Sequence, residues 1–124
     1  MITQQQIDDL VADINDILEE DRAKLKMSFH FAVDRLNDPR NKPPISLDEL
    51  RVIFTNFIQQ HLQTILDKDE GFSFTIKCQK SGIAIPCAIE HEIDIGAKWV
   101  IQQVITIMRN PQFQAYHGDV IFDI

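Results

Sequence analysis

The spacing of apolar residues changes once along this chain, at Glu70–Gly71, and this change constrains the fold more than any other feature. Before it, apolar residues recur at helical spacing, as in helices that pack on one side. After it, apolar and polar residues alternate, as in strands with one buried face. Because the two patterns occupy separate parts of the chain, the sequence predicts an α+β fold, with the helices first and an antiparallel sheet after them.

Three N-terminal helices are expected before this change. The first is an acidic amphipathic helix within residues 1–25. The other two share residues 28–67. The shorter one ends before Pro39, because a proline disfavours helical backbone at the residue that precedes it. The longer one begins at a capping box formed by Ser46 and Glu49.

Residues 71–124 are expected to form a four-stranded antiparallel sheet, with the three helices packed on one of its faces. The stretch 99–108 is nearly all apolar or β-branched, which is typical of a central strand covered on both faces. Pro86 has no N–H to donate, so it indicates an edge strand or a bulge. With 124 residues, the whole chain is expected to be a single domain.

The charge is unevenly distributed. The net charge of −7 works against tight, non-specific binding to nucleic acids. Residues 22–42 nevertheless hold six basic and two acidic side chains, whereas residues 1–21 hold seven acids and no base. Two interpretations of the basic segment remain open: a solvated loop, or a local patch that binds anions. The candidate phosphate- or anion-binding residues are Lys24, Lys26, Arg40 and Lys42.

Ser28–Asn41, with the sequence SFHFAVDRLNDPRN, is the stretch in which a functional site is most expected. Cleavage of RNA without a metal needs a base, an acid and cations that stabilise the developing phosphorane. Histidine suits the first two roles, and arginine suits the third. The candidate catalytic residues are therefore His30, Arg35, Arg109 and His117, if the fold brings them together.

No metal ion or cofactor is expected. Glu90, His91, Glu92 and Asp94 are close in sequence, but strand alternation would direct His91 away from its acidic neighbours. No apolar run approaches the roughly 20 residues of a membrane span. The N-terminus also lacks the basic and apolar regions of a signal peptide. These features favour a cytosolic protein, or one packaged in a particle made in the cytosol.

Several motifs together resemble a family of small uncharacterised proteins from tailed phages. The shared pattern is HF-x-x-R-x-NDPRN, an I-x-x-x-EL helix, an IP strand and a strand that ends in T-x-MR. In this chain the corresponding segments are 35–41, 45–50, 85–86 and 106–109. The resemblance implies a phage-encoded accessory protein, located in the host cytoplasm or packaged in the virion.

A more remote resemblance is to the RelE-type toxins and the phage endoribonuclease RegB, whose fold implies an RNase site across the sheet. In both of these groups a histidine precedes the arginine by four residues, whereas His30 precedes Arg35 by five. On a helix this turns His30 about 100° away from the expected position. A non-catalytic binding or virion-associated protein is therefore the first hypothesis, and a sequence-selective, metal-free endoribonuclease acting on mRNA is the alternative. The expected partner is a host or phage protein, with RNA and a second copy of the chain as further candidates, and no membrane.

Overall fold

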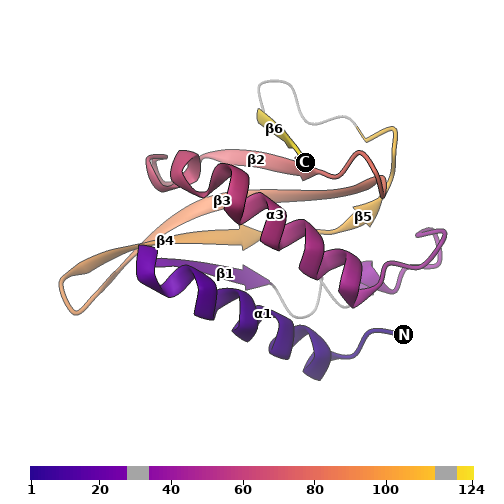
Figure 1. Cartoon of the computed structure of the whole chain (residues 1–124), viewed down its shortest axis with the longest axis horizontal. Helices are drawn as coiled ribbons and strands as arrows, with labels where there is room; N and C mark the ends of the chain where they lie inside the picture. Colours follow the sequence, from indigo (N-terminus) through magenta and orange to yellow (C-terminus); the bar gives the residue numbers. More distant parts are fainter. Residues whose placement is uncertain (28–33, 114–119) are drawn as a thin grey trace.

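Helices cover one face of a mixed six-stranded sheet in the computed structural model of the chain (Figure 1). The structure describes residues 1–27, 34–113 and 120–124. The α+β class predicted from the sequence is confirmed. No helix among the described residues is long and apolar enough to cross a membrane.

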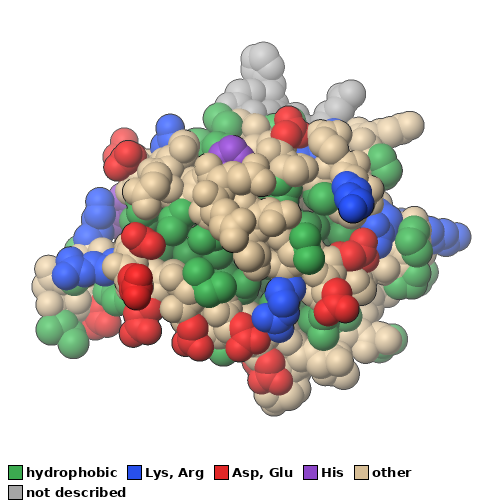
Figure 2. Space-filling view, viewed as in Figure 1, with side chains coloured by type: hydrophobic (Ala, Val, Ile, Leu, Met, Phe, Trp, Pro, Cys, Tyr) green, Lys and Arg blue, Asp and Glu red, His purple; other side chains and the backbone are tan. Residues whose placement is uncertain are grey.

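The first helix, α1 (Gln4–Leu18), is amphipathic as predicted. It buries Ile7, Leu10, Ile14 and Leu18 against the sheet and the second long helix, at spacings that place them on one side of the helix. Its acidic side chains form much of the red lower edge in Figure 2.

The helix α3 (Leu47–Leu66) begins at the predicted capping box. Ser46 and Glu49 each accept a hydrogen bond from the other's backbone N–H, which satisfies two groups that the helix start leaves unpaired. The buried side chains of α3 include Phe57, whose ring stacks on Phe74 of the sheet at a centroid distance of 5.6 Å. Residues 34–36 are also helical, and the rest of the second predicted helix lies outside the described residues.

The sheet has the strand order β1-β4-β3-β2-β6, with β5 paired to β3. The β1–β4 and β2–β6 pairs are parallel, and the other pairs are antiparallel. The strands are β1 (Ala23–Met27), β2 (Ser73–Lys77), β3 (Ile83–Asp94), β4 (Ala97–Val104), β5 (Met108–Arg109) and β6 (Val120–Asp123).

Two details of the predicted architecture are wrong. The sheet is neither four-stranded nor all antiparallel, because β1 joins one edge and β6 pairs in parallel with β2. The helix expected within residues 1–25 ends at Leu18. The left-handed backbone of Arg22 (φ 52°) then turns the chain into β1, where buried Ala23, Leu25 and Met27 alternate with lysines.

A bulge interrupts the pairing of β3 beside Pro86. Cys87 pairs with Val104 and Ala84 pairs with Met108, so two residues of β3 lie opposite three residues, 105–107. The proline cannot donate to this side of the ladder, and its carbonyl accepts from the N–H of Ile105 at 2.9 Å. Pro86 therefore marks a bulge, one of the two alternatives it indicated, and residues 105–107 leave the ladder to border a cleft.

Candidate anion-binding cleft

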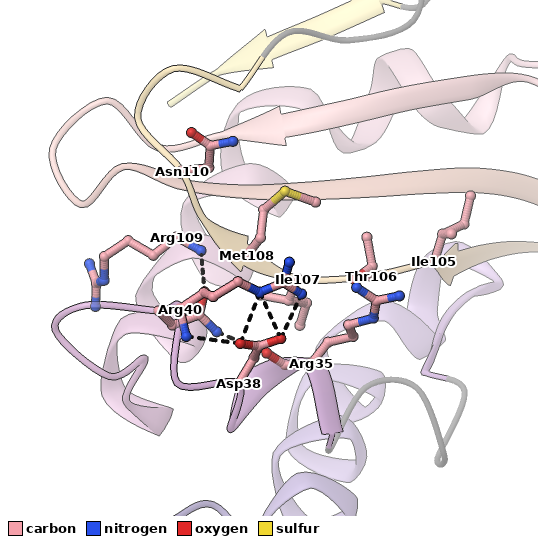
Figure 3. Close-up of a pocket in the computed structure, with 10 residues that line it drawn as sticks. Arg35, Asp38, Arg40, Ile105, Thr106, Ile107, Met108, Arg109 and Asn110 are labelled. Atoms are coloured by element: carbon pink, nitrogen blue, oxygen red, sulfur yellow. Dashed lines mark hydrogen bonds and ion pairs between the residues drawn. The ribbon is translucent and has the colours of Figure 1, made fainter.

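A cleft of about 710 Å³ lies between the NDPRN turn and the segment that follows β4 (Figure 3). Its polar wall comes from residues 35–41 and its less polar wall from residues 105–110. The residues that line it are Arg35, Asp38, Arg40, Asn41, Ile105, Thr106, Ile107, Met108, Arg109 and Asn110.

Two asparagines of the turn hold it in place. Asn37 accepts a hydrogen bond from the N–H of Ile2 (3.0 Å) and donates to the carbonyl of Ile2 (2.8 Å), which fastens the N-terminal segment. Asn41 is 6% exposed, donates to the carbonyls of Arg35 and Leu36, and accepts from the N–H of Arg109. The turn is therefore fixed to both neighbouring segments through backbone groups.

Asp38 and Arg40 form an ion pair at the opening of the cleft. The Nη2 atom of Arg40 donates to Asp38 Oδ2 at 2.8 Å, and its Nε donates to the same carboxylate. The backbone N–H of Arg40 also donates to Asp38 Oδ1 at 2.8 Å. These hydrogen bonds to the Arg40 side chain and backbone lower the pKa of Asp38 from 3.8 to about 2.

The guanidinium of Arg109 points away from the cleft (Figure 3), and the Arg109 side chain is only 8% exposed. It donates to the carbonyls of Pro43 (2.8 Å), Ser81 (2.7 Å) and Pro44 (3.2 Å). Its Nη2 also lies 2.8 Å and 3.0 Å from the two carboxylate oxygens of Glu49. Arg109 therefore joins the end of the sheet to the start of α3, and its hydrogen bond lowers the pKa of Glu49.

Arg35 has a different environment. Its side chain extends from residues 34–36 across the cleft toward the 105–107 segment (Figure 3). It is exposed, and it forms no hydrogen bond or ion pair within 1–27, 34–113 and 120–124. Ile105 is 53% exposed on the facing wall, whereas Ile107 is buried. The cleft thus combines an available cation with an accessible apolar side chain.

The structure brings together only some of the predicted site residues. Arg35, Arg40 and Arg109 all line the cleft, and Lys42 is exposed just after the turn. His30 and His117 lie outside the described residues. Lys24 and Lys26 line a separate groove on β1.

Each of these two lysines has a partner of its own. The Lys24 ammonium lies 4.9 Å from the centroid of the Trp99 ring, and Lys26 Nζ lies 3.3 Å from a carboxylate oxygen of Glu92. The basic segment predicted from the sequence is therefore divided between two places on the surface.

The part of the chain that the structure describes contains no group of three or more His, Cys, Asp or Glu side chains suited to a metal ion. His91 has a local role instead. Its Nε2 lies 3.0 Å from the carbonyl of Lys68, and its backbone N–H donates to Glu70.

Sequence reasoning missed Asn41 and the 105–107 segment as parts of the site. An asparagine beside a proline-containing turn commonly forms hydrogen bonds from its side chain to nearby backbone groups, and Asn41 has this position at the end of NDPRN. The exposure of Ile105 on the cleft has no such signal in the sequence, because it depends on the bulge.

Comparisons with protein-family models, curated proteins and solved structures gave no match. The function of the cleft is therefore inferred from the side chains that line it and from their contacts.

Proposed function

We propose that the protein is a non-catalytic binding protein whose cleft holds an acidic side chain of a partner protein against Arg35. One observation carries this proposal. Of the three arginines that line the cleft, Arg40 and Arg109 each bind a carboxylate, whereas Arg35 has no partner among the described residues. A guanidinium binds a carboxylate through two parallel hydrogen bonds, so Arg35 offers the group that such a partner needs.

The neighbouring apolar side chain narrows the class of ligand. Ile105 is 53% exposed on the wall that faces Arg35. A peptide with an acidic residue next to an aliphatic one would pair its charge with Arg35 and bury apolar surface on Ile105. The partner proposed is therefore a host or phage protein that presents such a segment.

The resemblance to small tailed-phage proteins supports the biological part of the proposal. The protein would be an accessory protein that acts in the host cytoplasm or is packaged in the virion. The narrower RelE/RegB-like fold also remains a proposal, supported by the helices packed on one face of the sheet.

The test is affinity capture from infected cells with the wild type, Arg35→Ala and Lys42→Ala, followed by calorimetry with the purified partner. Lys42 is a matched control because it is exposed beside the turn but does not line the cleft. Arg35→Ala is expected to weaken binding at least about tenfold, and Lys42→Ala about twofold or less. Equal binding by the wild type and Arg35→Ala would contradict the proposal.

Metal-free cleavage of mRNA is the second candidate function, because an exposed arginine in a cleft also suits a phosphate group. Its test is incubation of the purified protein with a mixed mRNA pool and mapping of the cut ends. If the wild type makes discrete cuts and Arg35→Ala, at an unchanged melting temperature, makes none, RNA cleavage would replace binding as the proposed function. Arg109→Ala is a poor probe for this purpose, since Arg109 holds three backbone carbonyls and Glu49.

A further inference from the structure

The segment 105–107 carries backbone groups that the sheet leaves unpaired. Because of the bulge beside Pro86, this segment belongs neither to β4 nor to β5. The N–H of Ile105 donates to the carbonyl of Pro86. Within residues 1–27, 34–113 and 120–124, the N–H groups of Thr106 and Ile107 and the three carbonyls of 105–107 have no hydrogen-bond partner.

These unpaired groups lie along one wall of the cleft, since all three residues line it. Backbone N–H and C=O groups are obligatory hydrogen-bonding groups, and in the free protein water satisfies the exposed ones. A row of them beside a sheet is also a template to which another extended chain can add. The wall therefore favours a ligand that brings both hydrogen-bond donors and acceptors.

Other classes of ligand satisfy this wall less well. A helix already uses its own backbone groups internally, so it would leave those of 105–107 unpaired. A phosphate oxygen accepts hydrogen bonds but donates none, so a phosphate would leave the carbonyls unpaired. An extended peptide offers N–H and C=O groups together, and it is the ligand that matches both kinds of group.

The opposite wall places a cation near such a peptide. The side chain of Arg35 extends across the cleft toward 105–107 (Figure 3). Asn41 holds the two walls together, because it bonds both the carbonyl of Arg35 and the N–H of Arg109. The cleft is therefore formed before a ligand arrives. At about 3.3 Å per residue, its unpaired wall provides pairing for about three residues of an extended chain.

We propose that the acidic segment of the partner binds as an added strand, with its backbone paired to residues 105–107 and its carboxylate on Arg35. This inference rests on the proposed function, because it specifies the conformation of the same ligand. In strand addition the main-chain hydrogen bonds supply affinity and the side-chain contacts supply specificity. Residues 105–107 therefore select an extended backbone, and Arg35 selects the acidic residue.

The test is an NMR titration of the wild type with the capped peptide acetyl-Thr-Val-Glu-Ile-Thr-amide and with a set of its singly N-methylated forms. Alternate residues of a strand turn their N–H groups toward the neighbouring strand. N-methylation is therefore expected to weaken binding at least about tenfold at alternate positions, and about twofold or less at the positions between them. The amide protons of Thr106 and Ile107 are expected to shift downfield on binding.

A pair of variants tests the same contact from the side of the protein. Thr106→Pro removes an N–H that has no partner in the described parts of the chain, so no hydrogen bond there is lost. Thr106→Ala keeps this N–H. The proline variant is expected to bind the peptide at least about tenfold more weakly than the alanine variant. Thermal unfolding checks that both are folded, and the methylation series needs only the wild type.

The outcomes separate this inference from the proposed function. If Arg35→Ala weakens binding but N-methylation has no alternating effect, the added strand is wrong and the proposed function stands. If the effect alternates but Arg35→Ala binds as tightly as the wild type, both are wrong.

Two further results would overturn the added strand. One is a peptide that does not bind at concentrations up to about 5 mM, in which case capture of the partner still tests the proposed function independently. The other is oligouridylate that shifts the amides of Thr106 and Ile107 when the peptide does not, which would assign the segment to RNA.

Discussion

The side-chain oxygen of Asn41 accepts a hydrogen bond from the backbone N–H of Arg109 at 2.9 Å, although 68 positions separate the two residues. The amide nitrogen of Asn41 donates in the opposite direction, to the carbonyl of Arg35 at 2.8 Å. One buried side chain therefore connects the residue that faces the cleft with the strand that forms its other wall. The shape of the cleft depends on this connection.

Replacement of Asn41 by alanine is expected to destabilise the protein by about 2–4 kcal/mol, because it leaves buried backbone groups without partners. Thermal unfolding monitored by circular dichroism measures the loss. Lys42→Ala, at an exposed neighbouring position, is the control and is expected to change stability by less than about 0.5 kcal/mol. Equal melting temperatures for the two variants would contradict the structural role of Asn41.

The sequence predicts the cap of α3, and it gives the bulge as one of two alternatives at Pro86, because both features depend on local chemistry. Ser46 and Glu49 lie within one helical turn, and the missing N–H of Pro86 has the same consequence in any ladder. The position of β1 is different. In the sequence, Lys24 and Lys26 continue a basic segment, but their alternation with apolar residues is the signal of a strand.

The parallel pairing of β2 with β6 and the orientation of Arg109 could not be predicted in this way. Both depend on which distant segments become neighbours, and hydrophobic spacing carries no such information. Arg109 is a candidate catalytic residue because its residue type suits contact with phosphate, and its place at a strand end also fits a purely structural role. The structure shows that its hydrogen bonds go to the 43–44 segment, Ser81 and Glu49.

Acid is expected to weaken the Asp38–Arg40 ion pair. In the folded protein the pKa of Asp38 is about 2, below its ordinary value of 3.8, so the ion pair stabilises the protein above pH 3.8. This contribution is lost as the pH falls from 3.8 to about 2. Titration of the Asp38 carboxyl carbon by NMR measures the pKa directly, and Arg40→Ala is expected to return it toward 3.8. An unchanged pKa in Arg40→Ala would assign the shift to other groups.

Glu49 is expected to contribute to stability over a related range of pH. Its pKa lies below the ordinary value of 4.5 because of the hydrogen bond from Arg109. The stabilisation is therefore complete above pH 4.5 and decreases as the pH falls through the lowered pKa. Urea unfolding at several pH values is expected to show a shallower decline below pH 4.5 for Glu49→Gln than for the wild type. Parallel curves for the two proteins would contradict this role.

Asn15 is expected to protect the exposed edge of the sheet. Its Oδ1 accepts from the N–H of Leu25 at 2.7 Å and its Nδ2 donates to the carbonyl of Leu25 at 3.2 Å, so the side chain replaces a neighbouring strand. Asn15→Ala is expected to cost about 1–2 kcal/mol and to speed exchange of the Leu25 amide hydrogen. Asp16→Ala, on the exposed side of α1, is the control for helix propensity. Equal exchange rates at Leu25 in both variants would show that Asn15 does not cover this edge.

His61 is expected to reduce stability relative to an apolar side chain. Its ring packs between Phe57 and Phe122, with centroid distances of 5.6 Å and 4.7 Å, and its Nε2 is buried without a hydrogen-bond partner in the described parts of the chain. A buried polar atom with no partner is costly, so His61→Leu is expected to raise stability by about 0.5–2 kcal/mol. Gln60→Leu, one position earlier and exposed, is the control and is expected to change stability little. A loss of more than about 1 kcal/mol in His61→Leu would mean that the imidazole has a polar partner beyond the described residues.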